Sequence, residues 1–277
     1  MNGNTKKVMV KRADNNGNTV WTTKVGQSPS TGTAYSAGYS IIQVRIFENL
    51  PSICVHLSLQ DNIDASKVYV GAGLWNANGN KMEPAVMALD ATSGNVLWTW
   101  TVSAYPGHGG VRSVIMDSGR IICTGYIRNF QPGFVFVADE AQAVVWELDA
   151  SGTLVKENIL GSQIPQGAKI RKVPSGGFVV ASTAWGVIGG QDVEVAGLVK
   201  LSNSLDLEWE ETYGMQGGMT QVFDVLVDNN GDYLMGGHTT VGNGVVNWDY
   251  VALKVNGQTR SLEWRKTWGQ PRGFNPQ

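Results

Sequence analysis

The sequence is poor in cysteine, in charge and in long apolar runs. Only two of its 277 residues are cysteine, 16% are charged, and the formal net charge is −2. Lysine and arginine are scattered rather than gathered into a basic stripe, which argues against nucleic acid as a partner. No apolar run approaches the roughly 18 residues of a membrane helix, so we expect no membrane insertion. The first ten residues, MNGNTKKVMV, also lack the apolar core of a signal peptide.

The two cysteines both lie in apolar, strand-like runs. Cys54 is in SICVHLSL and Cys123 is in RIICTGY. The simplest interpretation is two buried free thiols, because two cysteines fall far short of a disulfide framework. A single disulfide between them stays open as an alternative. No Cys/His pair has the spacing of metal ligands, so no metal site is predicted.

Glycine and tryptophan are abundant, with 35 and 10 residues, and both recur in one repeated hairpin. The copies read ADNNGNTVW at 13–21, ALDATSGNVLWTW at 88–100, LDASGTLVK at 148–156 and LSNSLDLEW at 201–209. Equivalent positions are filled by Trp21, Trp98, Lys156, Trp209 and Trp264. After a longer first interval, these positions recur about every 55 residues, which is typical of a propeller or a similar repeat array.

The last complete unit shows what each repeat contains. Residues 220–228 and 233–240 read as strands joined by the turn NNGD, and residues 249–255 and 261–269 read as a third and a fourth strand. Four antiparallel strands per unit indicate an all-β fold, a β-propeller of about five four-stranded antiparallel blades in a single domain. The predicted parts are a half blade at 1–27, an irregular insertion at 28–50, blades at approximately 51–104, 105–161, 162–214 and 215–270, and a tail at 271–277.

The long first interval leaves its strands less well defined. SICVHLSLQ at 52–60 is predicted as the first strand of the first complete blade. The preceding run YSIIQVRIF at 39–47 is interpreted as an added hairpin, an elongated inner strand or a loop crossing one face. Because the chain starts at a third strand and stops after a fourth, we expect an incomplete propeller. Another chain, or a missing part of the same polypeptide, would supply the completing strands.

Each residue type in the hairpin at 88–100 has a physical role. Asp90 is expected to accept hydrogen bonds from its own backbone across the turn. Gly94 is expected to adopt a left-handed conformation that costs other residues energy. Trp98 is interpreted as a flat wedge against the next blade, where such a ring buries on the order of 150–250 Å².

These hairpins resemble the short β-propeller repeats of large secreted and cell-surface proteins. The matching stretches include VKRADNNGNTVWTTKVG, VALKVNGQTRSLEWRKTWG and KVPSGGFVVAS. The resemblance implies a scaffold or binding role and an extracellular or cell-surface location.

Two families of propeller enzymes share parts of the same hairpin. ALDATSGNVLWTW is similar to the tryptophan-docking motif of pyrroloquinoline-quinone dehydrogenases, but the other copies fit it less well. The disulfide of adjacent cysteines common in those enzymes has no counterpart. Residues 13–21 are similar to the Asp-box turn of sialidases, yet no arginine triad, tyrosine nucleophile and acid can be nominated. A quinone-dependent or glycan-active enzyme is therefore the alternative to a binding module.

The histidines and carboxylates form no recognisable catalytic motif. His56, His108 and His238 lack a carboxylate and a nucleophile at triad spacing, and G-x-S-x-G, H-E-x-x-H and P-loop motifs are absent. DNNGD at 228–232 lacks the distal glutamate of a calcium loop and is interpreted as a hairpin turn. No catalytic residue and no cofactor is predicted.

The candidate binding surface lies on the predicted face that carries the long loops. Loops after the second strand and after the fourth strand of each blade are predicted to be long and aromatic, such as TAWGVIGGQDVE at 183–194, whereas the other turns are tight. Aromatic rings beside Asn and Gly suit sugars or peptide segments. The predicted ligand- or partner-binding residues are Trp75, Tyr105, His108, Arg128, Phe130, Trp185, Asn247 and Trp248. Alternatively, some of these rings pack between blades or under their own loops.

We therefore expect a non-enzymatic module that presents these loops to a glycan or a protein partner. Loops on a rigid scaffold are where binding residues concentrate. A propeller enzyme would instead bring two or more carboxylates, or an arginine and a histidine, together at the same face.

Overall fold

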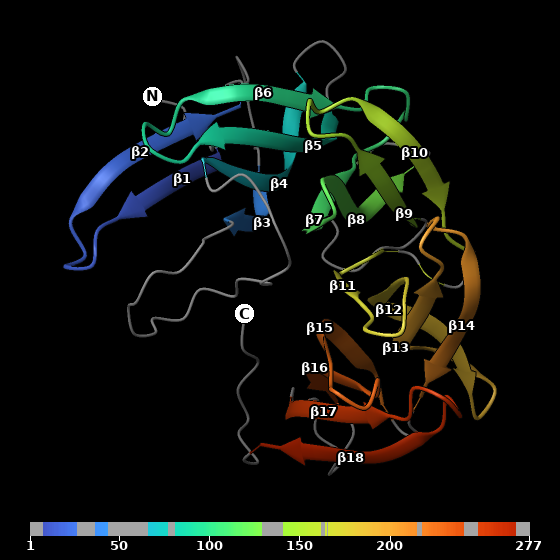
Figure 1. Ribbon diagram of the computed structural model, residues 1–277. Helices are drawn as coiled ribbons and strands as arrows, with labels where there is room; N and C mark the ends of the chain where they lie inside the picture. Colours follow the sequence, from blue (N-terminus) through green and yellow to red (C-terminus); the bar gives the residue numbers. More distant parts are fainter. Residues whose placement is uncertain are drawn as a thin grey trace, which may run out of the picture. The chain divides into compact units, whose positions relative to one another are not determined.

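The computed structural model describes most of the chain as short antiparallel strands. The described residues are 8–26, 37–43 (backbone only), 66–76, 81–128, 141–161, 164, 166–214, 218–240 and 249–269. They form eighteen strands and no helix (Figure 1). Over these same residues no helix has the length and apolar character to cross a membrane.

The strands form one two-stranded and four four-stranded antiparallel sheets. The first contains β1 (Val8–Ala13) and β2 (Thr19–Val25), and the second β3 (Ala37–Gln43), β4 (Lys67–Asn76), β5 (Lys81–Asp90) and β6 (Val96–Thr101). The third contains β7 (Gly110–Asp117), β8 (Arg120–Arg128), β9 (Ala141–Leu148) and β10 (Leu154–Ile159). The fourth contains β11 (Lys169–Lys172), β12 (Phe178–Ile188), β13 (Gln191–Leu201) and β14 (Leu207–Tyr213), and the fifth β15 (Thr220–Val227), β16 (Tyr233–Thr239), β17 (Asp249–Val255) and β18 (Leu262–Trp268). In each four-stranded sheet the strands lie side by side in sequence order, as predicted for a blade.

The first strand of the second sheet is a correction to the sequence prediction. β3 pairs with β4, so the strand lies inside the stretch that was predicted as an irregular insertion. Ile41 and Ile42 of the run YSIIQVRIF pair with Val70 and Tyr69. SICVHLSLQ, which was predicted to fill this position, lies outside the described residues. Both runs alternate in the same way, and only the pairing shows which one joins β4.

The chain divides into two compact units, and the boundaries between them in the sequence fall within β9 and β10. The first unit contains residues 1–141 and 145–157, and the second contains 142–144 and 158–277. In the first unit, β1 and β2 pack on β4 and β5 through an apolar cluster that includes Val10, Met87 and Leu89. In the second unit, β11–β14 pack on β15–β18 through a larger cluster. Leu198, Tyr213, Val225, Met235 and Leu253 are members of that cluster.

The turns between the third and fourth strands are closed by one repeated device. Asp90 Oδ1 accepts hydrogen bonds from the backbone N–H of Thr92 at 3.0 Å and of Ser93 at 2.7 Å, which confirms the predicted cap. Gly94 has the expected positive φ, at 76°. The equivalent acceptors are Asp14, Asp149, Ser202 and Asn256. An Asp, Ser or Asn side chain at the equivalent position therefore closes the turn in each of these five hairpins.

In the first unit, tryptophans join consecutive sheets at these turns. A Cβ added to Gly94 would lie 2.5 Å from Cδ2 of Trp21, and the Trp21 indole donates to Ala91 O at 3.1 Å. A Cβ added to Gly152 would lie 2.7 Å from Cε3 of Trp98. Trp98 is thus the wedge that the sequence predicted, with its ring on the turn of the next sheet.

The second unit repeats this arrangement with a different turn residue. Arg260 has φ 62° at the position that Gly17, Gly94 and Gly152 hold in the first unit. Its guanidinium carbon lies 5.2 Å from the ring centroid of Trp209, and its carbonyl accepts a hydrogen bond from the Tyr213 hydroxyl at 3.0 Å. The ring here meets a cation rather than bare backbone, and such a contact is favourable.

Cys123 is a free and fully buried thiol in β8. Its Sγ lies 3.7 Å from the carbonyl oxygen of Trp146, and burial raises the pKa of the thiol. The interpretation as a buried free thiol is therefore confirmed for Cys123. Cys54 lies outside the described residues.

Candidate functional site

Three predicted site residues of the first unit come together where β4 and β8 end. We call Trp75, His108 and Arg128 the rim cluster. The ring centroids of Trp75 and His108 lie 6.1 Å apart at an interplanar angle of 33°. The carbonyl of Arg128 accepts from Gly107 N at 2.9 Å, which brings the end of β8 beside the loop that carries His108. A strand end from each of two sheets and the loop between them therefore meet at this cluster.

The loop at 102–109 is held by the beginning of β5. The ammonium of Lys81 donates to the carbonyl of Ser103 at 2.7 Å and to the carbonyl of Tyr105. Met82 donates its N–H to Nδ1 of His108 at 2.9 Å, and its carbonyl accepts from Gly109 N at 2.9 Å. A loop pinned by main-chain and ammonium hydrogen bonds loses little freedom on binding, which is the condition for a preformed site.

The hydrogen bond from Met82 also fixes the protonation of His108. Because Nδ1 accepts an N–H, that nitrogen carries no proton, and in the neutral ring the proton is on Nε2. Burial lowers the pKa of His108, and the positive charge of Arg128 lowers it further. His108 is therefore a neutral hydrogen-bond donor next to the indole of Trp75.

Tyr105 follows the alternative interpretation, in which a loop ring packs against a sheet. Burial raises the pKa of Tyr105, and the neighbouring carboxylate of Glu157 raises it further. The same carboxylate accepts from the indole N–H of Trp146 at 2.8 Å. The phenol therefore stays protonated and lies toward the third sheet, and it anchors the loop rather than extending the rim cluster.

Trp185 lies in a strand, which corrects the prediction of a long loop at TAWGVIGGQDVE. β12 and β13 are paired along their whole length, with Trp185 opposite Glu194. The connection consists of Gly189 and Gly190, whose φ angles are 62° and 81°. Two glycines with positive φ form the tight turn that suits a two-residue hairpin, so the strands run on where the sequence suggested a loop. Trp75 likewise lies in β4, opposite Met82.

Phe130, Asn247 and Trp248 lie outside the described residues. Of the predicted surface, the structure therefore brings together Trp75, His108 and Arg128 in the first unit, and it places Trp185 in the second.

The second unit contains a polar chain that the sequence did not predict. Gln221 Nε2 donates to Glu194 Oε2 at 2.6 Å, and Gln221 Oε1 lies 2.5 Å from Nε2 of His238. Because the amide nitrogen of Gln221 is used by the carboxylate, its oxygen accepts from His238. Burial lowers the pKa of His238, whose ring meets that of Phe223 edge-on at 4.8 Å. Gln221 and His238 are cross-strand partners in β15 and β16, two strands that the sequence did predict as neighbours.

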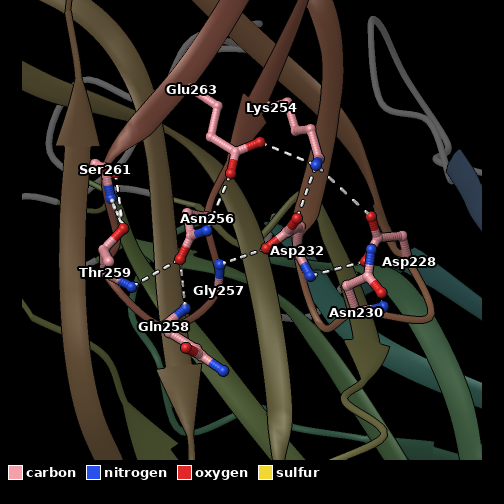
Figure 2. Close-up of polar contacts among 10 residues, drawn as sticks. All are labelled: Asp228, Asn230, Asp232, Lys254, Asn256, Gly257, Gln258, Thr259, Ser261 and Glu263. Atoms are coloured by element: carbon pink, nitrogen blue, oxygen red, sulfur yellow. Dashed lines mark hydrogen bonds and ion pairs between the residues drawn. The ribbon is translucent and has the colours of Figure 1, made fainter.

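A second polar cluster surrounds Lys254 in the last sheet (Figure 2). Its ammonium lies 2.7 Å from Asp232 Oδ2, 2.9 Å from Glu263 Oε2 and 3.9 Å from Asp228 Oδ2. Asp228 Oδ1 meanwhile accepts from the backbone of Asn230 and Asp232. DNNGD is therefore a hairpin turn, as predicted, and a lysine supplies its positive charge.

Lys254 and its carboxylates shift one another's proton affinities. The hydrogen bond from Lys254 lowers the pKa of Asp232, and hydrogen bonds from Asn256 and Lys254 lower that of Glu263. Hydrogen bonds to Asp232 and Glu263 raise the pKa of Lys254. The cluster is a structural ion-pair network that joins β17, β18 and the turn before β16. In the described part of the chain, no group of three His, Cys, Asp or Glu side chains is arranged to hold a metal ion.

Comparison with known proteins finds structural likeness without sequence relatives. No family model matches the sequence, and no curated protein matches it. The quinohemoprotein alcohol dehydrogenase of Comamonas testosteroni is similar in structure, with a TM-score of 0.51 and 10% identity over 95% of this chain and 51% of that chain. The quinohemoprotein alcohol dehydrogenase ADHIIG of Pseudomonas putida HK5 has a TM-score of 0.46 and 10% identity, over 95% of this chain and 52% of that chain. A subtype N10 neuraminidase-like protein of A/little yellow-shouldered bat/Guatemala/060/2010 has a TM-score of 0.47 and 11% identity, over 74% of this chain and 64% of that chain.

The likeness to the Comamonas testosteroni enzyme concerns the fold. This chain spans about half the length of that protein, and the identity of 10% gives no basis for transferring its chemistry. Four four-stranded antiparallel sheets, joined within each unit by tryptophans on the turns of the next sheet, agree with that likeness. The chain has an all-β, β-propeller fold built from four-stranded antiparallel blades.

Proposed function

We propose that the chain is a non-enzymatic binding module that presents the rim cluster to a glycan or a protein partner. The observation that carries the proposal is the pairing of Trp75 with His108, a partly exposed aromatic ring beside a neutral imidazole that donates from Nε2. A sugar ring offers one apolar face and hydroxyl groups at its edge, which match an indole and a nearby donor. A peptide segment with a carbonyl beside an apolar side chain fits the same pair.

One observation favours an enzyme as the second candidate. The charge of Arg128 acts on His108, so an arginine and a histidine do converge at this rim, as a catalytic site requires. However, His108 uses Nδ1 to accept from Met82, and Arg128 is only 2% exposed. A group held by the main chain and a buried cation are better placed to shape a site than to exchange protons with a ligand. A quinone-dependent or glycan-active reaction is therefore the weaker proposal.

We also propose a location and a mode of assembly, supported by the resemblance of the repeats and by the sheets. Repeats of this kind in large secreted and cell-surface proteins support an extracellular or cell-surface location. The sheet of β1 and β2 has two strands among the described residues, so β1 forms one of its edges. An exposed strand edge is a template for another strand, which supports completion of this sheet by another chain or by further polypeptide.

Binding to a glycan array and to immobilised candidate proteins tests the proposal with one variant in the rim cluster and one control. Trp75→Ala removes the aromatic face and is expected to weaken binding about tenfold or more, as for a central aromatic contact. Val187→Ala shortens an apolar side chain that is 71% exposed in the second unit and is expected to leave binding unchanged. Wild-type binding by Trp75→Ala contradicts the site. Chemical conversion of the captured ligand during incubation favours the enzyme.

A further inference from the structure

The two sheets of the second unit differ in whether another sheet packs on their outer pair of strands. One face of β11–β14 is covered by β15–β18, and the equivalent face of β15–β18 is exposed. In both sheets the tryptophan of the fourth strand pairs with a lysine, Trp209 with Lys200 and Trp264 with Lys254. Counting from that pair along each strand, the pair Ala196 and Tyr213 in β13 and β14 corresponds to Tyr250 and Trp268 in β17 and β18. The pair Tyr250 and Trp268 therefore occupies the position in the last sheet that Ala196 and Tyr213 occupy in the sheet before it.

The exposure of these equivalent residues differs sharply. Ala196 is fully buried and Tyr213 is 8% exposed, because β15–β18 cover them. Tyr250 is 76% exposed and Trp268 is 53% exposed. Two aromatic rings on a cross-strand pair form a continuous apolar surface, and such surfaces on soluble proteins mark sites of association.

The hairpin of β1 and β2 has the same kind of turn that packs against a tryptophan in two other sheets. A tryptophan of the preceding sheet packs against Gly94 and another packs against Gly152. Gly17 has the same Asx turn and a φ of 83°, but a Cβ added there would meet nothing within 4 Å. Met9 and Val20 are 62% and 49% exposed, on the side of the hairpin that points away from the cluster containing Val10.

Charge and hydrogen bonding also match between the two surfaces. In the contact of Trp21 with Gly94, Thr23 Oγ1 donates to the Gly94 carbonyl at 2.5 Å. The residue at the same offset from Trp264 is Lys266, whose ammonium lies 5.4 Å from that ring. The turn at Gly17 offers a carbonyl and the carboxylate of Asp14, whose pKa is lowered by hydrogen bonds from Asn18. If the two surfaces were stacked, the lysine beside the wedge would lie opposite an acceptor and a negative charge on the turn.

We propose that β15–β18 of one copy stack on the β1–β2 hairpin of a second copy, with Trp264 on the turn at Gly17. Tyr250 and Trp268 then cover Met9 and Val20, and Lys266 pairs with the turn. The two surfaces differ, so the contact is heterologous and copies associate head to tail. This surface is separate from the rim cluster and does not depend on its ligand.

Sedimentation of the purified chain over a range of concentrations tests the proposal. The wild-type chain is expected to self-associate as its concentration rises. Tyr250→Ser combined with Trp268→Ser removes the aromatic face, and Gly17→Asn fills the turn with a residue that tolerates positive φ. Each change is expected to weaken association about tenfold or more, as for central interface residues. A wild-type chain that stays monomeric up to the highest soluble concentration overturns the proposal.

Two controls exclude general effects of these changes. Gly119→Asn alters another turn glycine with φ 84° and open space around it, and Val187→Ser removes an apolar side chain that is 71% exposed. Both are expected to associate like the wild type.

Mixing the variants tests the polarity of the contact. Gly17→Asn retains the aromatic face, and the double serine variant retains the open turn, so an equimolar mixture is expected to form a 1:1 dimer that grows no further. A mixture that stays monomeric while the wild type associates overturns the head-to-tail arrangement.

Discussion

Cε3 of Trp98 lies 2.7 Å from the position that a Cβ on Gly152 would occupy. The ring of one sheet therefore rests directly on the backbone of the turn in the next. Any side chain at residue 152 must either move the ring or leave the turn, and the two sheets are joined at this point only because glycine is there.

Gly152→Ala is expected to destabilise the protein by about 3 kcal/mol, from the strain of a left-handed alanine and from overpacking against Trp98. The measurement is the free energy of unfolding in urea. Gly17→Ala is the matched control, because its φ of 83° is almost the same as the 86° of Gly152 but no atom lies within 4 Å. The control is expected to cost only the strain, about 1–2 kcal/mol. Equal losses in the two variants contradict the tryptophan contact.

Stability is expected to fall as the pH drops below about 6.5, the pKa of an unperturbed histidine. The pKa values of His108 and His238 are both lowered in the folded chain, mainly by burial. The unfolded chain therefore binds more protons between the folded and unfolded pKa values, and protonation favours unfolding. The contribution of both histidines is fully present above pH 6.5 and is lost as the pH falls through the folded pKa values.

Chemical unfolding at a series of pH values between 8 and 5 measures this slope. A variant with His108→Gln and His238→Gln is expected to show a flatter profile over the same range. A wild-type profile that is level or rises toward pH 5 contradicts the burial of the two rings.

Lys254→Met is expected to lower the midpoint of urea unfolding, because it removes the cation that neutralises Asp232 and Glu263. The pKa of Asp232 should rise toward its ordinary value, since the hydrogen bond from Lys254 is the main cause that lowers it. The loss should therefore be present at neutral pH and should shrink as the pH falls through the pKa of Asp232 in the folded wild type. NMR titration of the Asp232 carboxyl carbon provides the direct measurement.

Lys266→Met serves as the comparison for Lys254→Met. Lys266 lies on the exposed side of β18, where its contact is with the ring of Trp264. The change at Lys266 is expected to leave the titration of Asp232 as it is in the wild type. An unchanged Asp232 pKa in Lys254→Met would show that the ion pair does not hold the carboxylate in solution.

The repeated hairpin made much of the fold predictable, because its signals are local. Asp90, Gly94 and Trp98 stand within a few residues of one another, and each has a conformational preference that does not depend on distant sequence. The position of the tryptophan wedge followed from the repeat alone. The cap, the left-handed glycine and the sheet-to-sheet contact all appear as predicted.

Predictions were wrong where two structural interpretations fitted the local sequence equally well. YSIIQVRIF and SICVHLSLQ both alternate like inner strands, and only pairing with β4 selects Ala37–Gln43. The Gly-Gly pair at 189–190 is typical of a loop and of a two-residue hairpin, and the register of β12 with β13 decides for the hairpin. Local pattern carries no information about which partner a strand finds.

The candidate site was less predictable than the fold because its contacts are non-local. Trp75 and His108 were nominated as surface residues, but the hydrogen bond from Met82 that sets the charge of His108 depends on how β5 and the following loop meet. Glu194 and Gln221 belong to different sheets, and their contact at 2.6 Å follows from the stacking of those sheets. Sequence spacing offers no signal for either contact.

Leu205 and Arg260 adopt left-handed backbone at the turn position where other copies have glycine. Their φ angles of 64° and 62° show that the same turn geometry forms without the residue best suited to it. Within this array the shape of the turn is therefore more uniform than its sequence. A search pattern that demands glycine at this place would overlook both copies, so related chains are better sought by comparing shape than by comparing letters.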